Sequence, residues 1–157
     1  MLDQTNLSIM LKNKNLLKDK AYINGTWVDA RSGKSFEVVN PASGDVIVSV
    51  PDLDVYDARN AIDAAHQAFP RWSKKTAKER SIILNKFCKL MLENADDLAA
   101  ILTAEMGKPI AEAKGEITYG ASFIEWFAEE GKRVYGETIP GHQEDKRIIV
   151  LKQPVGV

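Results

Sequence analysis

The sequence predicts an α+β protein built from an N-terminal β-meander, four helices and one terminal strand. Three observations support this class. Short apolar runs separated by turn signals occupy residues 21–51, and apolar residues recur at helical spacing through residues 54–135. A continuous apolar run then follows within residues 147–153. The 157 residues are enough for one domain with a hydrophobic core.

The charge balance argues against two classes of partner. The chain carries 21 basic and 22 acidic side chains, which gives a net charge of −1. General nucleic-acid binders and proteins of anionic membrane surfaces have a basic excess, so we expect no nucleic acid and no membrane as partner. The lysines within residues 11–21 form a local basic arm, which we expect to be solvated and partly disordered.

Cysteine usage and the N-terminal sequence bear on location. Cys88 is the only cysteine, so no internal disulfide is possible and a reducing compartment is compatible. The first 20 residues include an early Asp3 but no arginine and no long apolar segment. They resemble neither a secretory signal nor a transit peptide. We therefore expect a cytoplasmic protein.

Turn signals predict the strands of the meander. Asn24-Gly25 lies between two short apolar runs and is the strongest hairpin signal, because both central residues of a type I′ turn need positive φ. Further strands are expected at residues 36–39 and 46–50, and Pro51 ends the second of them. Such a small meander needs a partner surface for stability.

Two helices are expected next. The first covers residues 54–69, has an apolar stripe on one face and ends at Pro70. The second opens at the sequence Thr76-Ala77-Lys78-Glu79, which fits a capping box. Cys88 lies inside the second helix among apolar residues. We interpret it as a small core residue, because a reactive thiolate needs cationic or helix-N-terminal surroundings.

Two more helices complete the helical region. Asn94 is expected to cap the third helix with Asp97 at its third position, and Gly107 is expected to end it in the left-handed conformation. The fourth helix is expected over residues 109–135, with a proline at its first position. No strand is expected at residues 136–141, which lead into a loop.

The stretch 119–142 is the densest aromatic run of the chain. At 3.6 residues per turn, Tyr119, Phe123 and Trp126 fall on one face of the fourth helix. A stripe of this kind is either plain core or the apolar wall of a ligand tunnel. Periodicity alone favours core, because buried aromatic residues more often pack than bind.

The sequence contains no complete catalytic constellation. It has neither a G-x-G-x-x-G motif nor a Walker loop. One cysteine and the two distant histidines, His66 and His142, give no zinc-ligand cluster. Acidic pairs at i, i+4 spacing, such as Glu112 and Glu116, are typical of a solvated helix face.

Several stretches together resemble the N-terminal part of the aldehyde dehydrogenase superfamily. They read INGTWVDA, VVNPASGDVIVSVP, TAKERSIIL, LTAEMGKPIAEAKGEI and SFIEWFAEEGKRVYGETIPGH through KQPVGV. The resemblance covers residues 22–157, and its later motifs are most similar to the bacterial NAD(P)-dependent succinate-semialdehyde dehydrogenase branch. It implies an α/β family fold, of which the chain holds three parts: an N-terminal arm (1–20), the first part of the dinucleotide-binding domain (21–140) and the start of an oligomerisation strand (141–157).

The resemblance also implies an activity. In that family a cysteine thiol attacks the aldehyde, hydride passes to NAD or NADP, and a glutamate activates the water that releases the acid. Cys88 does not match that cysteine, and we assign no catalytic and no cofactor-binding residue here. We expect the full-length enzyme to oxidise succinate semialdehyde to succinate with NAD or NADP. We expect this chain alone to bind no dinucleotide and to be inactive; the alternative is a non-catalytic fragment that acts only as an assembly module.

Three further expectations follow from the resemblance. Tyr119 aligns with a residue of the substrate entrance, and Phe123 and Trp126 would extend that wall, with core packing as the alternative. A structural monovalent cation would take the Val39 carbonyl and the Glu105 carboxylate as ligands, together with a ligand outside this chain. The alternative for Glu105 is an ordinary surface carboxylate. The terminal strand resembles the arm that builds dimers and tetramers, so we expect a homo-oligomer.

Overall fold

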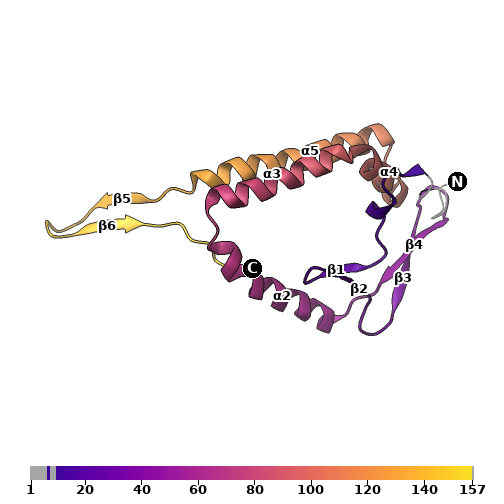
Figure 1. The fold of residues 1–157 in the computed structure, drawn as a ribbon, viewed down its shortest axis with the longest axis horizontal. Coiled ribbons are helices and arrows are strands. Elements are labelled where there is room, and N and C mark those ends of the chain that lie inside the picture. Colours follow the sequence, from indigo (N-terminus) through magenta and orange to yellow (C-terminus); the bar gives the residue numbers. More distant parts are fainter. Residues whose placement is uncertain (1–6, 8–9, 157) are drawn as a thin grey trace.

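The computed structural model describes Leu7 and residues 10–156. Within this part, four α-helices and three two-stranded antiparallel sheets make up the fold (Figure 1). The α+β expectation is confirmed. The strands are β1 (Ala21–Ile23), β2 (Thr26–Val28), β3 (Ser35–Val39), β4 (Val46–Pro51), β5 (Glu137–Pro140) and β6 (Arg147–Val150). The helices are α2 (Val55–Ser73), α3 (Ala77–Glu93), α4 (Ala95–Met106) and α5 (Ile110–Glu130), with short 3-10 turns η1 (Lys14–Leu16) and η2 (Gly131–Arg133).

The first two hairpins form where the turn signals predict them. Asn24 and Gly25 have φ of 50° and 79°, as a type I′ turn requires, and they connect β1 to β2. Strands β3 and β4 pair from Ser35 with Pro51 to Val39 with Val46. The register shifts between Val38 and Val39, so Ile47 of β4 has no opposite partner and forms a bulge beside the turn.

The predicted capping box at the start of α3 is confirmed, and α2 begins at a capping box that was not predicted. The Asp54 side chain accepts hydrogen bonds from the amides of Tyr56 at 2.8 Å and Asp57 at 3.3 Å, and the Asp57 carboxylate accepts one from the Asp54 amide at 3.2 Å. Thr76 and Glu79 form the expected reciprocal pair at the start of α3. Each cap satisfies amides that the first helical turn leaves without partners.

The predicted end of the first helix at Pro70 is wrong, because α2 continues through Pro70 to Ser73. Proline removes the hydrogen bond to the carbonyl four residues earlier, at His66. Both residues are exposed and only the last turn follows, so solvent can satisfy that carbonyl.

Asn94 does not cap the third helix. Its side-chain nitrogen instead donates to the Leu90 carbonyl at 2.8 Å and closes the helix before it. Gly107 ends α4 with φ of 74°, as expected. The fourth helix starts at Ile110 and ends at Glu130, not at residue 135 as expected. The chain continues into the 3-10 turn η2 at Gly131, because glycine is a poor helix former.

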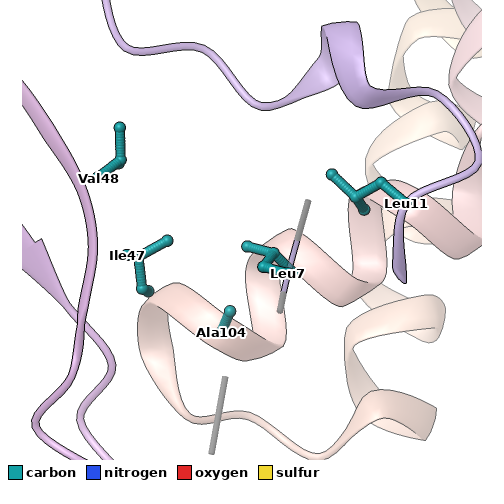
Figure 2. Packing of buried hydrophobic residues seen from close by; sticks show 5 residues of the cluster. All are labelled: Leu7, Leu11, Ile47, Val48 and Ala104. Carbon is teal, nitrogen blue, oxygen red and sulfur yellow. The ribbon is translucent and has the colours of Figure 1, made fainter. Parts of the chain in front are cut away.

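The N-terminal arm is solvated along its lysines, which are all exposed, but buried leucines anchor its beginning. Leu7 is 0% exposed and Leu11 is 4% exposed. They form one buried cluster with Ile47 and Val48 of β4 and Ala104 of α4 (Figure 2). The arm is therefore part of the main hydrophobic cluster of the described residues.

Helices α3 and α5 run side by side, and α4 packs against α5 at one end, while α2 lies across an open space from them (Figure 1). Helix α5 packs through three small side chains, Ala113, Ala121 and Ala128, which are 0%, 1% and 1% exposed. Their small size lets the helix backbones approach closely. The overall outline is an open frame with the β3–β4 hairpin and α2 on one side and α3–α5 on the other.

The C-terminal region forms a hairpin instead of a single strand. Strand β5 occupies residues to which the sequence analysis gave no strand, and it pairs from Glu137 with Val150 to Pro140 with Arg147. Strand β6 ends at Val150 rather than at residue 153. The hairpin projects away from the helices, and every residue of both strands is exposed (Figure 1).

Gly107 and Gly115 allow a matched test of this backbone. We expect Gly107→Ala to destabilise the chain by roughly 1–2 kcal/mol, the penalty for an L-residue in the left-handed region. A Cβ at this position would also lie 3.1 Å from Pro41 Cγ. Urea unfolding followed by circular dichroism measures the change.

The control is Gly115→Ala, in a helix interior where an added Cβ has no neighbour within 4 Å. It should stabilise α5 by roughly 0.5–1 kcal/mol, because alanine loses less backbone freedom than glycine. Equal midpoints for Gly107→Ala and the wild type would contradict the assignment of Gly107 as a left-handed cap.

Candidate functional site

One corner of the frame brings together the end of β3 and the end of α4. The turn after β3 lies against the C-terminus of α4, because a Cβ on Gly107 would lie 3.1 Å from Pro41 Cγ. Asn40 is 5% exposed and fixes this turn: its side chain accepts from the Ala42 amide at 2.9 Å, and its amide donates to the Asp45 carbonyl at 2.8 Å. Val39 and Glu105 each lie within two residues of this contact.

The electrostatics of this corner favour a cation. Glu105 is exposed on the last turn of α4, yet partial desolvation of its carboxyl raises the pKa of that group. Within the described part of the chain, Glu105 has neither an ion pair nor a side-chain hydrogen bond. The C-terminal end of a helix carries partial negative charge, which adds to that of a carboxylate. A cation at this end would neutralise both the carboxylate charge and the partial negative charge of the helix end.

Two buried oxygens of the same elements also lack partners in the described structure: Asp45 Oδ2 in the turn between β3 and β4, and Thr103 Oγ1 on α4. Unpaired buried oxygens are rare in proteins. Oxygen donors suit hard cations. No group of three or more His, Cys, Asp or Glu side chains occurs among residues 10–156 and Leu7, so this corner is unlike a zinc or carboxylate-rich calcium site. A monovalent cation held by the Val39 carbonyl and the Glu105 carboxylate stays a prediction.

The aromatic stripe is exposed on α5. Tyr119, Phe123 and Trp126 are 65%, 46% and 63% exposed, so none of them packs into the interior of the described chain. The rings of Tyr119 and Phe123 meet edge to face, with centroids 4.8 Å apart. The three residues thus form an open apolar wall.

An open hollow of about 710 Å³ adjoins this wall. Phe123 and Trp126 line it, whereas Tyr119 reaches it only through its contact with Phe123. Phe127, which the helical-face argument did not select, also lines the hollow, because it follows Trp126 directly and stands one turn after Phe123. Glu129 and Arg133 are polar members of the lining.

A polar contact attaches this part of α5 to α3. The side-chain nitrogen of Asn85 donates to the Ser81 carbonyl at 3.1 Å and to Glu129 Oε1 at 3.4 Å. Lys132 lies 2.6 Å from the Glu129 carboxylate. Lys132 first, and then Asn85, holds the pKa of Glu129 below its usual range. The lining of the hollow is therefore anchored to the neighbouring helix.

Cys88 lies away from both features. It is 7% exposed on α3, so its interpretation as a small core residue is confirmed. A buried thiol in apolar surroundings is chemically inert.

The described residues do not fit a nucleotide-binding cradle. Such a site places a phosphate at a helix N-terminus that follows a strand of a parallel sheet. All strand pairs among the described residues are antiparallel. That this chain alone binds no dinucleotide stays a prediction. In the same part of the chain, no helix is both long and apolar enough to cross a membrane.

Comparisons with known proteins agree on one family. Residues 27–157 match the aldehyde dehydrogenase family. The chain is 58% identical over 149 residues to the glutarate-semialdehyde dehydrogenase of Pseudomonas putida, covering 95% of the chain and 31% of that protein. It is 59% identical over 147 residues to the NADP(+) succinate-semialdehyde dehydrogenase of Escherichia coli, covering 94% of the chain and 30% of that protein.

A solved structure gives the same picture in three dimensions. The succinate-semialdehyde dehydrogenase from Burkholderia pseudomallei matches with a TM-score of 0.92 at 52% identity, over 94% of the chain and 30% of that structure. The chain therefore spans about 30% of the length of the curated relatives that it matches.

Glu105→Gln tests the electrostatics of the corner. A carboxyl group whose pKa is raised by folding makes the folded state bind more protons than the unfolded state. Stability is then highest below the ordinary value of 4.5 and falls as pH rises through the raised pKa of the folded state. Glutamine cannot ionise, so we expect Glu105→Gln to be more stable than wild type near pH 7 and equal to it near pH 4.

Thermal unfolding at both pH values, in choline buffers free of sodium and potassium, measures the difference. Glu37→Gln replaces an exposed carboxylate on β3 and serves as the control, with no comparable gain expected. An equal rise in melting temperature for Glu105→Gln at both pH values would show that the packing of the new side chain, and not the loss of its charge, causes the change.

Proposed function

The chain belongs to the aldehyde dehydrogenase family, and we propose that it forms the N-terminal part of an NAD(P)-dependent dehydrogenase that oxidises succinate semialdehyde to succinate. The observation that carries this proposal is the 58–59% identity, over 94–95% of the chain, to two semialdehyde dehydrogenases. Both named substrates have an aldehyde at one end and a carboxylate at the other. Glutarate semialdehyde, one methylene longer, is the second candidate substrate.

In this proposal, the residues of the chain guide the substrate. Tyr119, Phe123 and Trp126 form an apolar wall beside the entrance, against which the methylene stem of the aldehyde lies. NAD or NADP supplies the hydride acceptor. The wall excludes water from the approach path and thereby strengthens electrostatic interactions deeper in the site. This role needs the side chains exposed on α5, and they are.

The chain by itself is proposed to be inactive. Its only thiol, at Cys88, is buried, and its described strands do not form the sheet that a dinucleotide needs. One observation then favours a second function: the projecting β5–β6 hairpin exposes apolar side chains. Ile149 in β6 is 68% exposed, and Leu151, the first residue after β6, is 72% exposed. An exposed apolar strand edge pairs readily with another chain. The homo-oligomer of the family would use this arm, and the isolated chain would act only in assembly. A cytoplasmic location likewise stays a prediction.

A monovalent cation is proposed at the corner between β3 and α4, held by the Val39 carbonyl and the Glu105 carboxylate together with a ligand outside this chain. Its role is structural: it would neutralise the Glu105 carboxylate at the negative end of α4. We expect potassium, compared with choline at equal ionic strength, to raise the melting temperature of the wild type but not of Glu105→Gln. The same increase in both proteins would argue against Glu105 as a ligand.

Enzyme assays test the substrate and the role of the chain together. A protein carrying this chain and the remaining two thirds of its relatives' length should oxidise succinate semialdehyde with NAD or NADP. Its kcat/KM for butanal, which lacks the carboxylate, should be lower by roughly 10- to 100-fold, because hydrogen bonds to a charged group contribute about 1.5–3 kcal/mol. The 157-residue chain, assayed under the same conditions, should give no reduced cofactor.

Two variants separate the interpretations of the aromatic wall. Tyr119→Ala in the long protein should raise KM with little change in melting temperature, whereas a core role predicts the reverse. Tyr135→Ala, an exposed aromatic outside the wall, is the matched control and should change neither quantity. Equal kcat/KM values for butanal and succinate semialdehyde would contradict the proposed substrate class. Turnover by the 157-residue chain would contradict its proposed inactivity.

A further inference from the structure

Among the described residues, the two sides of the frame approach each other at two corners (Figure 1). One side holds the β3–β4 hairpin and α2, and the other holds α3, α4 and α5. At one corner the chain passes directly from α2 to α3 through residues 74–76. At the opposite corner no such short link joins β4 to α4, so side-chain packing has to hold the two sides together.

The N-terminal segment fills that second corner. We define the N-terminal strap as Leu7 and residues 10–13. Leu7 and Leu11 belong to one buried cluster with Ile47 of β4 and Ala104 of α4, and Leu7 lies nearer to β4 than Leu11 does (Figure 2). Leu7 and Ile47 are the two largest fully buried side chains of the described structure. Ala104 offers only a methyl group, so the two leucines of the strap are the largest side chains that the strap and α4 contribute to the fully buried part of this cluster, while Ala100 and Ile101 of α4 pack at its edge.

A buried carboxylate fixes the other end of the strap. Asp97, in the first turn of α4, is 6% exposed. Its Oδ1 accepts from the Lys12 amide at 3.1 Å, and its Oδ2 accepts from the Asn13 amide at 2.8 Å. Bonds from amides to a carboxylate are stronger than neutral ones, and the N-terminal end of a helix favours the negative charge. The strap is thus bonded to α4 and packed on β4.

The Lys12 side chain makes a much weaker connection. Its ammonium lies 3.3 Å from the Asp96 carboxylate, but the lysine side chain is 80% exposed. Exposed ion pairs of this kind contribute little to stability. Lys12 therefore makes two contacts of different strength. Its backbone amide, bonded to Asp97, holds the strap, whereas its side-chain ion pair with Asp96 does not.

We propose that the N-terminal strap is a latch that holds the β3–β4 hairpin onto α4 and keeps the frame closed at this corner. Leu7 and Leu11 supply the packing, and Asp97 supplies the anchor. When the latch is released, the hairpin separates from α4 while α3 and α5, packed on each other through their own seam, stay together. Val39 and Glu105 lie on opposite sides of the latch, so its state sets their separation whether or not a cation binds.

Pulsed electron paramagnetic resonance between two spin labels tests the latch in the full chain. Cys88→Ala removes the native thiol, and Ala42→Cys and Glu112→Cys place labels at exposed positions on the two sides. With the strap intact, we expect one narrow distance distribution. Leu11→Ala and Asp97→Ala should each lengthen the mean distance and broaden the distribution, and the milder Leu11→Val should do so to a smaller extent.

Two controls keep the test decisive. Lys12→Ala removes only the exposed ion pair and should leave the distribution narrow. A second label pair at Lys86→Cys and Glu112→Cys, both within the helical side, should be unchanged in every variant, which verifies that the helices remain folded. If Leu11→Ala and Asp97→Ala keep the wild-type distribution between the two sides while the helical pair is intact, the latch does not exist.

Discussion

The packing of α5 through alanine decides what the rest of this structure can present. At 3.6 residues per turn, successive residues are about 100° apart around a helix, so Ala113, Ala121 and Ala128 share one face. Tyr119 and Trp126 lie on the opposite face. Because the small face is the one that contacts the neighbouring helices, the large aromatic side chains remain outside. The candidate entrance wall is therefore exposed because the alanine face of α5, with its small side chains, is the face that packs against the neighbouring helices.

A second consequence is that the hydrophobic interior of the chain is small. Apolar side chains on three helices stay largely exposed, including Ile62 on α2, Phe87 on α3 and Phe127 on α5. This agrees with a chain that spans about 30% of the length of its relatives, whose matching segments keep the same arrangement at a TM-score of 0.92. Exposed apolar surface of this kind normally marks an interface. The helices thus form an open frame, and the main buried cluster lies at one of its corners.

That corner combines stability with a candidate site. The N-terminal strap packs β4 onto α4, and the turn after β3 lies on the left-handed cap of the same helix. Within the described residues, the Glu105 carboxylate and the buried oxygens of Asp45 and Thr103 have no polar partner, and they belong to the elements that the strap and turn bring together. Uncompensated oxygen atoms lower stability, and proteins retain them where a ligand or ion uses them.

Features set by a few neighbouring residues could be predicted from the sequence alone. The Asn24-Gly25 turn, the Thr76–Glu79 capping box and the left-handed Gly107 each depend on local geometry, and the family follows from short motifs. Placing Tyr119, Phe123 and Trp126 on one helical face likewise needed only the helical period.

The tertiary structure alone decided the features that depend on distant partners. Asp97 has the spacing of a helix cap, yet it binds amides 84 and 85 positions earlier in the chain. The lysine-rich arm has the composition of a solvated tail, yet its leucines find apolar partners on β4 and α4. Residues 137–140 form a strand only because residues 147–150 fold back to pair with them. In each case a long-range contact supplies the free energy that outweighs the local preference, and local patterns contain no information about which distant groups will meet.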